Sequence, residues 1–197
     1  MPLTVRPLTP DLWPAFADFF ASPDASSDPR WCWCAYWRVR GLDWSNSTAE
    51  GNRTLLGDIV AGDGRPPGLV ALDEDGTAIG WVSVGPREDY ERLEHSRVLA
   101  RLDDAPVWSI VCFVVAKRAR GEGVARALLD AAIAFARAEG ARVLEAYPID
   151  TAGGRMSSAS VYVGSLSMFE SAGFDVAAVR QASANARPRP IVRLAID

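Results

Sequence analysis

The sequence predicts a mixed α/β fold in one domain that spans residues 1–197. Short runs rich in valine, isoleucine and leucine, typical of strands, alternate with longer runs whose apolar residues recur at helical spacing. The apolar fraction is 49% and the charged fraction 23%, as in ordinary globular domains. Because a chain of this length can bury a substantial core, we expect a single domain.

The first third of the chain predicts an edge strand at residues 3–6 and a short amphipathic helix at 11–20. Ser47 and Glu50 have the spacing of a capping box, in which each side chain accepts a backbone N–H at the start of a helix. We therefore expect a helix from there to about residue 61.

The middle of the chain predicts a hairpin followed by a buried strand. Residues 68–72 and 78–84 have strand character, and Asp73 to Gly76 supply the polar turn between them. Residues 107–115 are almost continuously apolar, which indicates a strand covered on both faces.

The last third predicts a long alanine-rich helix over 121–139, which ends before Gly140, a natural helix C-cap. Further strands are expected at 143–147, 174–179 and 191–196, and a short helix at 165–172.

A glycine-rich turn, Arg120-Gly121-Glu122-Gly123-Val124-Ala125, separates the buried strand from the long helix. Glycine adopts positive φ easily and lets a backbone approach a ligand closely. The first N–H groups of a helix have no internal partner, and the helix dipole there favours an anion. Arg120 and Arg126 add positive charge, so the turn predicts a pyrophosphate site.

The dinucleotide fingerprint G-x-G-x-x-G fails here, because Arg126 stands where its third glycine is needed, and the P-loop pattern is absent. The remaining pattern R-x-x-G-x-A, at Arg120, Gly123 and Ala125, resembles the acetyl-coenzyme A motif of the GNAT superfamily of N-acetyltransferases. The segment E-S-A-G-F at 170–174 is similar to the superfamily's Y-E-K-x-G-F segment. The resemblance covers about residues 107–180.

The resemblance implies a central, mixed but largely antiparallel sheet of six or seven strands, splayed in the middle and flanked by about four helices. It also implies acetyl-coenzyme A as cofactor. The strand backbone at Phe113, Val114 and Val115 would pair with the pantetheine arm. The pyrophosphate would lie on the turn formed by Arg120, Gly121, Gly123, Val124, Ala125 and Arg126.

The superfamily transfers an acetyl group directly to an amine, which needs a deprotonated amine and a proton donor for the leaving thiolate. The tyrosine that commonly donates this proton falls at Phe169, which has no proton to give. Substitutes are Tyr162 and Ser167, with Ser165 and Tyr147 as further alternatives.

Glu145 is the candidate base, because it lies in a strand among apolar neighbours, where burial would raise its pKa. The alternative is a structural carboxylate held in a salt bridge. Asp150 and Glu88 are further candidates.

The segment Trp31-Cys32-Trp33-Cys34-Ala35-Tyr36-Trp37 is unusually rich in tryptophan. Trp31, Trp33 and Trp37 are predicted to form a wall for the acceptor substrate, since aromatic faces accept cations and flat rings. The alternative is an aromatic flap that belongs to the core. A second candidate for acceptor contacts is the segment from Arg87 to Arg92, in a loop that faces the same cleft in the superfamily.

Composition limits the partners. The net charge is −4 without a basic stripe, which disfavours nucleic acid. No apolar run is long enough to span a membrane, and the start of the chain lacks a signal-peptide core. Three cysteines are too few for a disulfide scaffold, so we expect a cytoplasmic protein. With one histidine and one C-x-C pair, we expect no metal centre.

The expected function is acetyl-coenzyme A-dependent N-acetylation of a primary amine on a small molecule or a protein. The alternatives are transfer of a longer acyl group, or a domain that binds acyl-coenzyme A without catalysis. A homodimer is one assembly that the resemblance implies, because many relatives pair.

Overall fold

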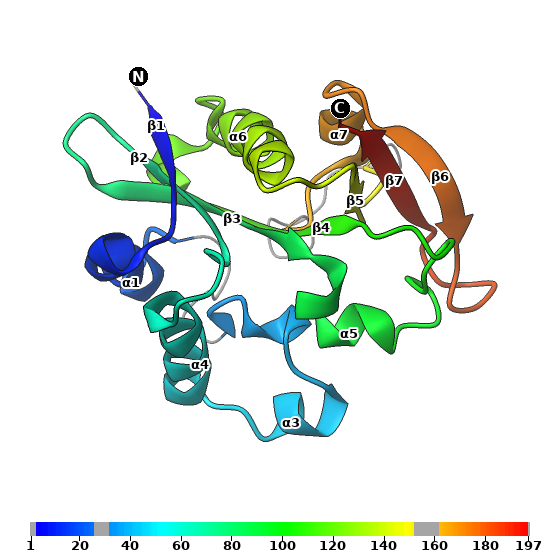
Figure 1. Cartoon of the computed structure of the whole chain (residues 1–197), viewed down its shortest axis with the longest axis horizontal. Coiled ribbons are helices and arrows are strands. Elements are labelled where there is room, and N and C mark those ends of the chain that lie inside the picture. The colour runs from blue at the N-terminus through cyan, green and yellow to red at the C-terminus, as the bar shows by residue number, and fades with distance from the viewer. Residues whose placement is uncertain (1–2, 26–31, 152–161, 197) are drawn as a thin grey trace.

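The computed structural model describes residues 3–25, 32–151 and 162–196. Its centre is a seven-stranded sheet in the order β1-β2-β3-β4-β5-β7-β6 (Figure 1). The strands are β1 (Thr4–Pro7), β2 (Gly68–Leu72), β3 (Ala78–Pro86), β4 (Trp108–Val115), β5 (Val143–Ala146), β6 (Asp175–Arg180) and β7 (Arg189–Ala195). All neighbours are antiparallel except β4 and β5. The predicted mixed, largely antiparallel sheet is therefore confirmed.

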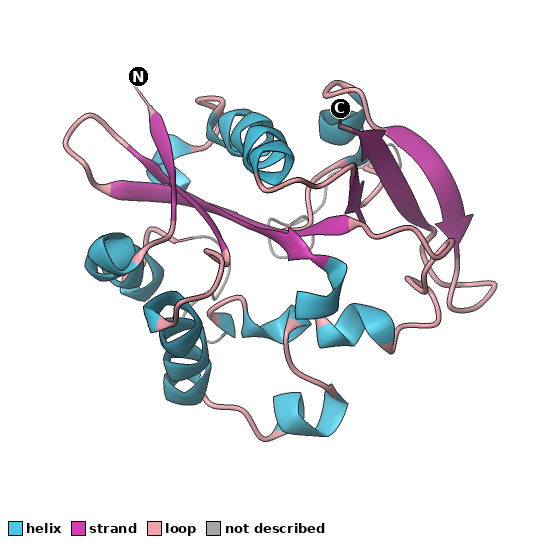
Figure 2. Ribbon diagram, viewed as in Figure 1, coloured by secondary structure: helices cyan, strands magenta, loops and turns pink. Residues whose placement is uncertain are grey.

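Helices cover both faces of this sheet (Figure 2). The described residues form the α-helices α1 (Trp13–Ala21), α3 (Gly41–Ser45), α4 (Ala49–Ala61), α5 (Glu91–Glu94), α6 (Val124–Ala138) and α7 (Leu166–Glu170). They also form the 3-10 helices η1 (Pro10–Leu12), η2 (Ala35–Trp37), η3 (Arg87–Asp89) and η4 (Lys117–Ala119). In Figure 1, α6 lies on one face of the sheet, and α1 and α4 lie on the other.

Two helix starts differ from the sequence expectation. The side chain of Thr48, rather than Ser47, caps α4 by accepting the Gly51 N–H at 3.0 Å, while the Ser47 hydroxyl donates to the Trp44 carbonyl. The long helix α6 begins at Val124 rather than at residue 121, because the glycine turn before it has positive φ. Both differences come from backbone geometry within one turn of the helix start.

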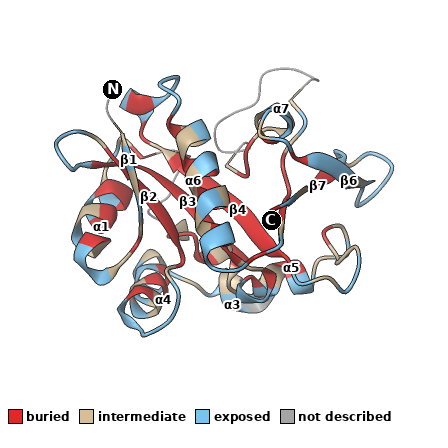
Figure 3. Cartoon of the chain, turned by 45° about the horizontal axis from the view of Figure 1, so that its top comes forward, coloured by how far each residue is buried: buried red, intermediate tan, exposed pale blue. Residues whose placement is uncertain are grey.

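The core follows the middle of the sheet. Every residue of β2 is buried, as are nearly all of β3 and β4, whereas the outward face of α6 is exposed (Figure 3). Gly80 on β3 lets α6 pack closely, since a Cβ there would come within 2.8 Å of Val124 Cγ1. This contact fixes the start of α6, and with it the glycine turn, against the sheet.

Strands β4 and β5 pair for only three residues, Trp108↔Leu144, Ser109↔Glu145 and Ile110↔Ala146. Beyond Ile110, β4 continues to Val115 without β5 beside it, so the sheet opens there as expected. In the described part of the chain, the Phe113 N–H on this open edge donates to the carbonyl of Tyr162 at 2.6 Å. The opening therefore lies between β4 and β5, and the short helix η4 separates the end of β4 from the glycine turn.

Within the described ranges, no helix is long and apolar enough to cross a membrane. The same ranges contain no group of three or more histidine, cysteine, aspartate or glutamate side chains that could hold a metal ion.

Candidate active site

The glycine turn forms one wall of a pocket of about 330 Å³ at the end of β4. The pocket is lined by Val115, Ala119, Arg120, Gly121, Gly123, Val124, Ala125, Arg126 and Met168. Gly121 and Gly123 have φ of 82° and 81°, a conformation that L side chains rarely adopt. A Cβ on either glycine would meet no atom within 4 Å, so the space above the turn is open. Six predicted residues of the pyrophosphate turn thus lie together at one open pocket.

The charges around this pocket are not equally available. Arg126 binds Asp130 at 2.8 Å on its own helix and donates to the Ser171 hydroxyl at 3.1 Å. Arg118, just before the turn, pairs with Asp24 and Asp73. Arg120 is exposed and forms no ion pair with any residue that the structure describes. Arg120 and the N-terminus of α6 are therefore the positive groups open to an anion.

The β4 edge expected to hold the pantetheine arm is partly occupied. The backbone N–H and C=O of Val114 point toward β3, where Val114 pairs with Trp81. The backbone groups of Phe113 and Val115 point the other way, toward the opening. The Phe113 N–H already donates to Tyr162, so an incoming amide carbonyl would have to replace that contact. Val115 lines the pocket at the glycine turn.

Of the two predicted proton donors, Tyr162 lies against β4 through the contact of its carbonyl with Phe113. Its side chain is half-buried, and burial is the main cause that raises the pKa of its phenol above the usual value. The neighbours Tyr36 and Cys112 raise the pKa further, and Arg189 opposes them. The phenol therefore keeps its proton, and the backbone of the residue lies beside β4.

Ser167, the other predicted donor, is exposed on α7, and its hydroxyl lies 3.3 Å from that of Ser165. Ser165 caps α7, because its hydroxyl accepts the Met168 N–H at 3.3 Å. Phe169, at the position of the superfamily's tyrosine, is fully buried between Phe113 and Phe174.

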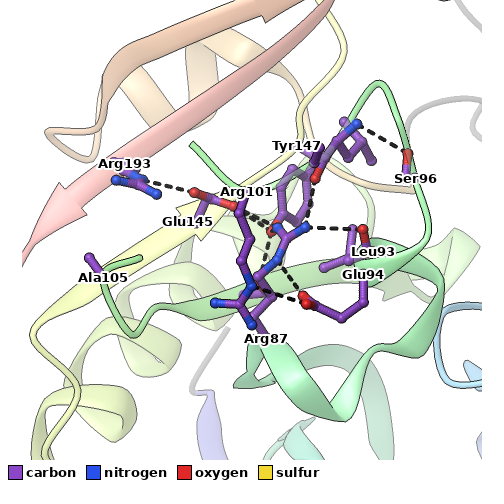
Figure 4. Close-up of polar contacts among 12 residues, drawn as sticks. Arg87, Leu93, Glu94, Ser96, Arg101, Ala105, Glu145, Tyr147 and Arg193 are labelled. Atoms are coloured by element: carbon purple, nitrogen blue, oxygen red, sulfur yellow. Dashed lines mark hydrogen bonds and ion pairs between the residues drawn. The ribbon is translucent and has the colours of Figure 1, made fainter. Parts of the chain in front are cut away.

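Glu145 lies at the closed end of the opening, in a buried network of polar groups (Figure 4). Its Oε1 accepts from Arg87 Nη1 at 2.9 Å and from the Tyr147 hydroxyl at 2.7 Å. Its Oε2 accepts from Arg193 Nε at 2.8 Å. With both oxygens engaged and the side chain 1% exposed, Glu145 has the geometry of the salt-bridged structural carboxylate that was the alternative to a base.

The prediction that Arg87 contacts the acceptor is wrong, because its side chain is fully buried and does not face a cleft. Besides Glu145, its guanidinium donates to Glu94, to the Tyr147 hydroxyl and to two backbone carbonyls (Figure 4). Every nitrogen of the group therefore has a partner inside the protein, and none is left for a substrate. The sequence placed Arg87 in a loop, and only the fold reveals its burial.

The aromatic segment divides between the core and a cavity. Trp33 is buried and packs on Phe16 and Phe20, with ring centroids 6.3 and 5.5 Å apart, so it forms part of the core flap rather than the predicted wall. Trp37 is also buried but lines a cavity described below. Trp31 lies outside the described residues.

Cys34 anchors this segment to the sheet. Trp33 and Cys34 have φ of 46° and 52°, a strained conformation for residues other than glycine. The Cys34 thiol donates to the Cys112 sulfur on β4 at 3.2 Å and accepts from Trp81 Nε1 at 3.1 Å. The pKa of Cys34 is raised, mainly by the contact with Cys112. These contacts hold η2 against β3 and β4.

A larger cavity of about 660 Å³ is assembled from three segments: η2 with the start of α3, α5 with the loop after it, and the β6–β7 connection. Its lining residues are Tyr36, Trp37, Arg40, Gly41, Arg92, His95, Ser96, Val98, Leu99, Ala182, Ala186, Arg187 and Arg189. Arg189 donates to the carbonyl of Tyr147, the residue directly after β5, so the cavity reaches the start of the opening in the sheet. Tyr36 and Trp37 come from the predicted aromatic segment, and Arg92 from the second segment predicted to contact the acceptor. The other lining residues were not predicted, because no local pattern joins segments so far apart.

The chain belongs to the acetyltransferase (GNAT) family, whose model matches residues 18–162. No curated protein matches the chain.

Solved structures share the fold. A GCN5-related N-acetyltransferase from Kribbella flavida is 23% identical, with a TM-score of 0.56 and coverage of 98% of this chain and 97% of that one. The ribosomal-protein-S18-alanine N-acetyltransferase from Escherichia coli is 15% identical, with a TM-score of 0.54 and coverage of 100% and 95%. A NatC complex bound to Gag peptide and CoA is 14% identical, with a TM-score of 0.53 and coverage of 100% of each chain. The family match confirms the predicted membership of the GNAT superfamily, and these structures agree with it in fold.

Proposed function

We propose that this chain is an acetyl-coenzyme A-dependent N-acetyltransferase that transfers the acetyl group directly to a primary amine of a small molecule or a protein. The observation that carries the proposal is the open pocket of about 330 Å³ where the positive-φ glycine turn meets the part of β4 that has no β5 beside it. This arrangement provides unpartnered helix N–H groups for a pyrophosphate beside a strand edge that faces the opening, for an amide-containing arm.

The residues fit the cofactor that the family generally uses. Gly121, Gly123, Val124 and Ala125 would hold the pyrophosphate through their backbone, with Arg120 adding charge. The backbone at Val115, and at Phe113 once Tyr162 releases it, would hold the pantetheine arm. When bound, acetyl-coenzyme A supplies a thioester that an amine can attack.

Tyr162 is the proposed proton donor for the thiolate that leaves. Its raised pKa keeps the phenol protonated at any pH at which an amine is acetylated. Its backbone also contacts β4 at Phe113, on the edge where the sheet opens and where acyl group and amine would meet. Glu145 acts as a positioning residue, because its network holds β4 and β5 together at Ser109.

One experiment separates the proposal from a domain that binds without catalysis. Thermal unfolding is measured with acetyl-coenzyme A, with coenzyme A and with NAD as a control. A ligand present at about 100 times its dissociation constant stabilises the folded state by about 2.7 kcal/mol. Stabilisation by the first two alone supports the cofactor, and release of free thiol with an amine panel then supports catalysis.

The other outcomes discriminate between the alternatives. Stabilisation without thiol release from any amine would favour the non-catalytic binder, for which the buried Phe169 argues. Faster release from longer acyl-coenzyme A thioesters than from acetyl-coenzyme A would favour transfer of a longer acyl group. No stabilisation by either coenzyme would refute the cofactor assignment.

A further inference from the structure

The cavity of about 660 Å³ is strongly cationic. Four arginines line it, together with the histidine at position 95: Arg40, Arg92, Arg187 and Arg189. No aspartate or glutamate is among the lining residues that the structure describes. In a chain with a net charge of −4, this concentration of guanidinium groups needs an explanation.

Unpartnered donors gather at the same cavity. Among the described residues, four side-chain nitrogens are buried without a hydrogen-bond partner. Three of them, Trp37 Nε1, Arg92 Nη2 and Arg189 Nε, belong to residues that line this cavity. Buried donors are almost always satisfied in folded proteins, and leaving one unsatisfied costs free energy. Three at one cavity indicate a ligand that accepts hydrogen bonds.

The contacts that the two inner arginines do make leave their charges unneutralised. Arg92 Nε donates to the Tyr36 carbonyl at 2.7 Å, and its guanidinium lies 3.9 Å from the Tyr36 ring centroid. Arg189 Nη2 donates to the Tyr147 carbonyl at 3.5 Å. Neither forms an ion pair with a described carboxylate. These neutral contacts orient each guanidinium and keep its positive charge available to a ligand.

Glu91 contributes a carboxylate beside two lining residues, although it is not itself among the lining residues. Glu91 lies 3.5 Å from Arg40 and 3.7 Å from His95, and all three side chains are about half exposed. Glu91 therefore offsets the charge of Arg40 at the entrance, where solvent screens it. Arg92 and Arg189 keep the excess of positive charge inside.

We propose that the acceptor amine carries an oxyanion, a carboxylate or a phosphonate, which Arg92 and Arg189 bind with help from the Trp37 indole N–H. This rests on the proposed function, since it names the substrate class for that transferase. Both a carboxylate and a phosphonate present two or more oxygens that accept charge-assisted hydrogen bonds, and both suit a guanidinium fork. Because Arg189 contacts Tyr147 directly after the last residue of β5 that pairs with β4, an anion held here would leave the amine near the opening of the sheet.

The test compares acceptors that differ only in the anion. Thiol release is measured with L-phenylalanine against 2-phenylethylamine, and with 2-aminoethylphosphonate against ethylamine. We expect kcat/KM to be roughly tenfold or more higher for the anionic member of at least one pair. Preference for the carboxylate or the phosphonate pair identifies the anion. An equal or higher kcat/KM for the member without the anion, in both pairs, would overturn the proposal.

Variants connect the preference to the cavity. Arg189→Gln and Arg92→Gln should each remove roughly tenfold from kcat/KM of the anionic acceptor, with little change for its neutral partner or in the KM for acetyl-coenzyme A. Arg137→Gln, on the exposed side of α6, is the matched control. An equal loss for both members of a pair would mean that the arginines only support the fold, and the proposal would fail.

A binding measurement keeps this result separate from the fate of the transferase. Thermal unfolding is followed with N-acetyl-L-phenylalanine and N-acetyl-2-aminoethylphosphonate, and with the neutral N-acetyl counterparts of both. Stabilisation by an anionic member alone, lost in Arg189→Gln, supports the anion site even if no turnover is seen. If coenzyme A stabilises the protein but no anionic compound does, the transferase proposal stands and the anion proposal is refuted.

Discussion

Arg87 Nη1 lies 2.9 Å from Glu145 Oε1, and both side chains are excluded from solvent. The pair joins η3, which follows β3, to β5, and so spans the position where β4 and β5 still pair. The Tyr147 hydroxyl extends the connection to β4, because it lies 2.9 Å from the Ser109 hydroxyl. Burial raises the pKa of Tyr147, so its phenol stays protonated and donates to Glu145. The network therefore secures the closed end of the opening in the sheet.

Arg87→Met should lower the free energy of unfolding by about 3–5 kcal/mol, because it leaves the Glu145 carboxylate buried without its main charge partner. Urea unfolding followed by circular dichroism measures the change. Arg137→Met, an exposed arginine on α6, should change it by no more than about 0.5 kcal/mol. Similar losses in the two variants would contradict the structural role of Arg87.

Gly123→Arg should abolish stabilisation by coenzyme A, because the new side chain would occupy the pocket at the turn. The substitution also forces an L residue into φ of 81°, which costs about 1–2 kcal/mol of stability. Thermal unfolding with and without coenzyme A measures both effects.

Gly76→Arg is the matched control for that variant. Gly76 has φ of 75° in the turn between β2 and β3, and a Cβ there also meets no atom within 4 Å. It should lose a similar amount of stability and keep the full response to coenzyme A. If Gly123→Arg retained its response, the turn would not be the pyrophosphate site.

Tyr162→Phe should lower kcat by about a hundredfold while leaving the KM for acetyl-coenzyme A within about twofold, because the phenol acts only as the thiolate leaves. Steady-state thiol release measures both constants, and the melting temperature checks the fold. Ser167→Ala tests the rival donor in the same assay. A large loss in Ser167→Ala with normal turnover in Tyr162→Phe would transfer the role to α7.

Stability should decline above pH 10 in a way that depends on Tyr90. Burial raises the pKa of Tyr90 from 10.0 to about 12, so between these values the unfolded chain loses a proton that the folded chain retains. The free energy of unfolding therefore falls as pH rises, by about 1.4 kcal/mol from this group at about pH 11. Tyr90→Phe should remove that part of the decline.

Urea unfolding at about pH 9 and about pH 11 measures this difference, with Tyr36→Phe as the control for loss of a half-buried phenol. The Tyr90 hydroxyl lies 3.1 Å from the buried Ser83 hydroxyl, so Tyr90→Phe also loses some stability at both pH values. An identical pH dependence in wild type and Tyr90→Phe would show that Tyr90 does not titrate differently in the two states.

The sequence by itself determined the individual strands and helices and the conformation of the glycine turn. Gly121 and Gly123 are separated by one residue, and the conformation of the turn depends on their φ and on the start of the helix that follows, so six consecutive residues are enough to predict it. The buried strand at 107–115 was likewise visible, since β4 is apolar along its length.

Only the tertiary structure decided which charged groups are buried with partners and which line a cavity. Arg87 and Arg189 are both arginines in polar stretches of sequence, yet the first is saturated inside the protein and the second lines a cavity. Trp33 and Trp37 divide in the same way between core and cavity. The reason is physical: a turn's conformation depends on neighbours in the chain, whereas burial and charge partnership depend on packing between segments that are distant in sequence.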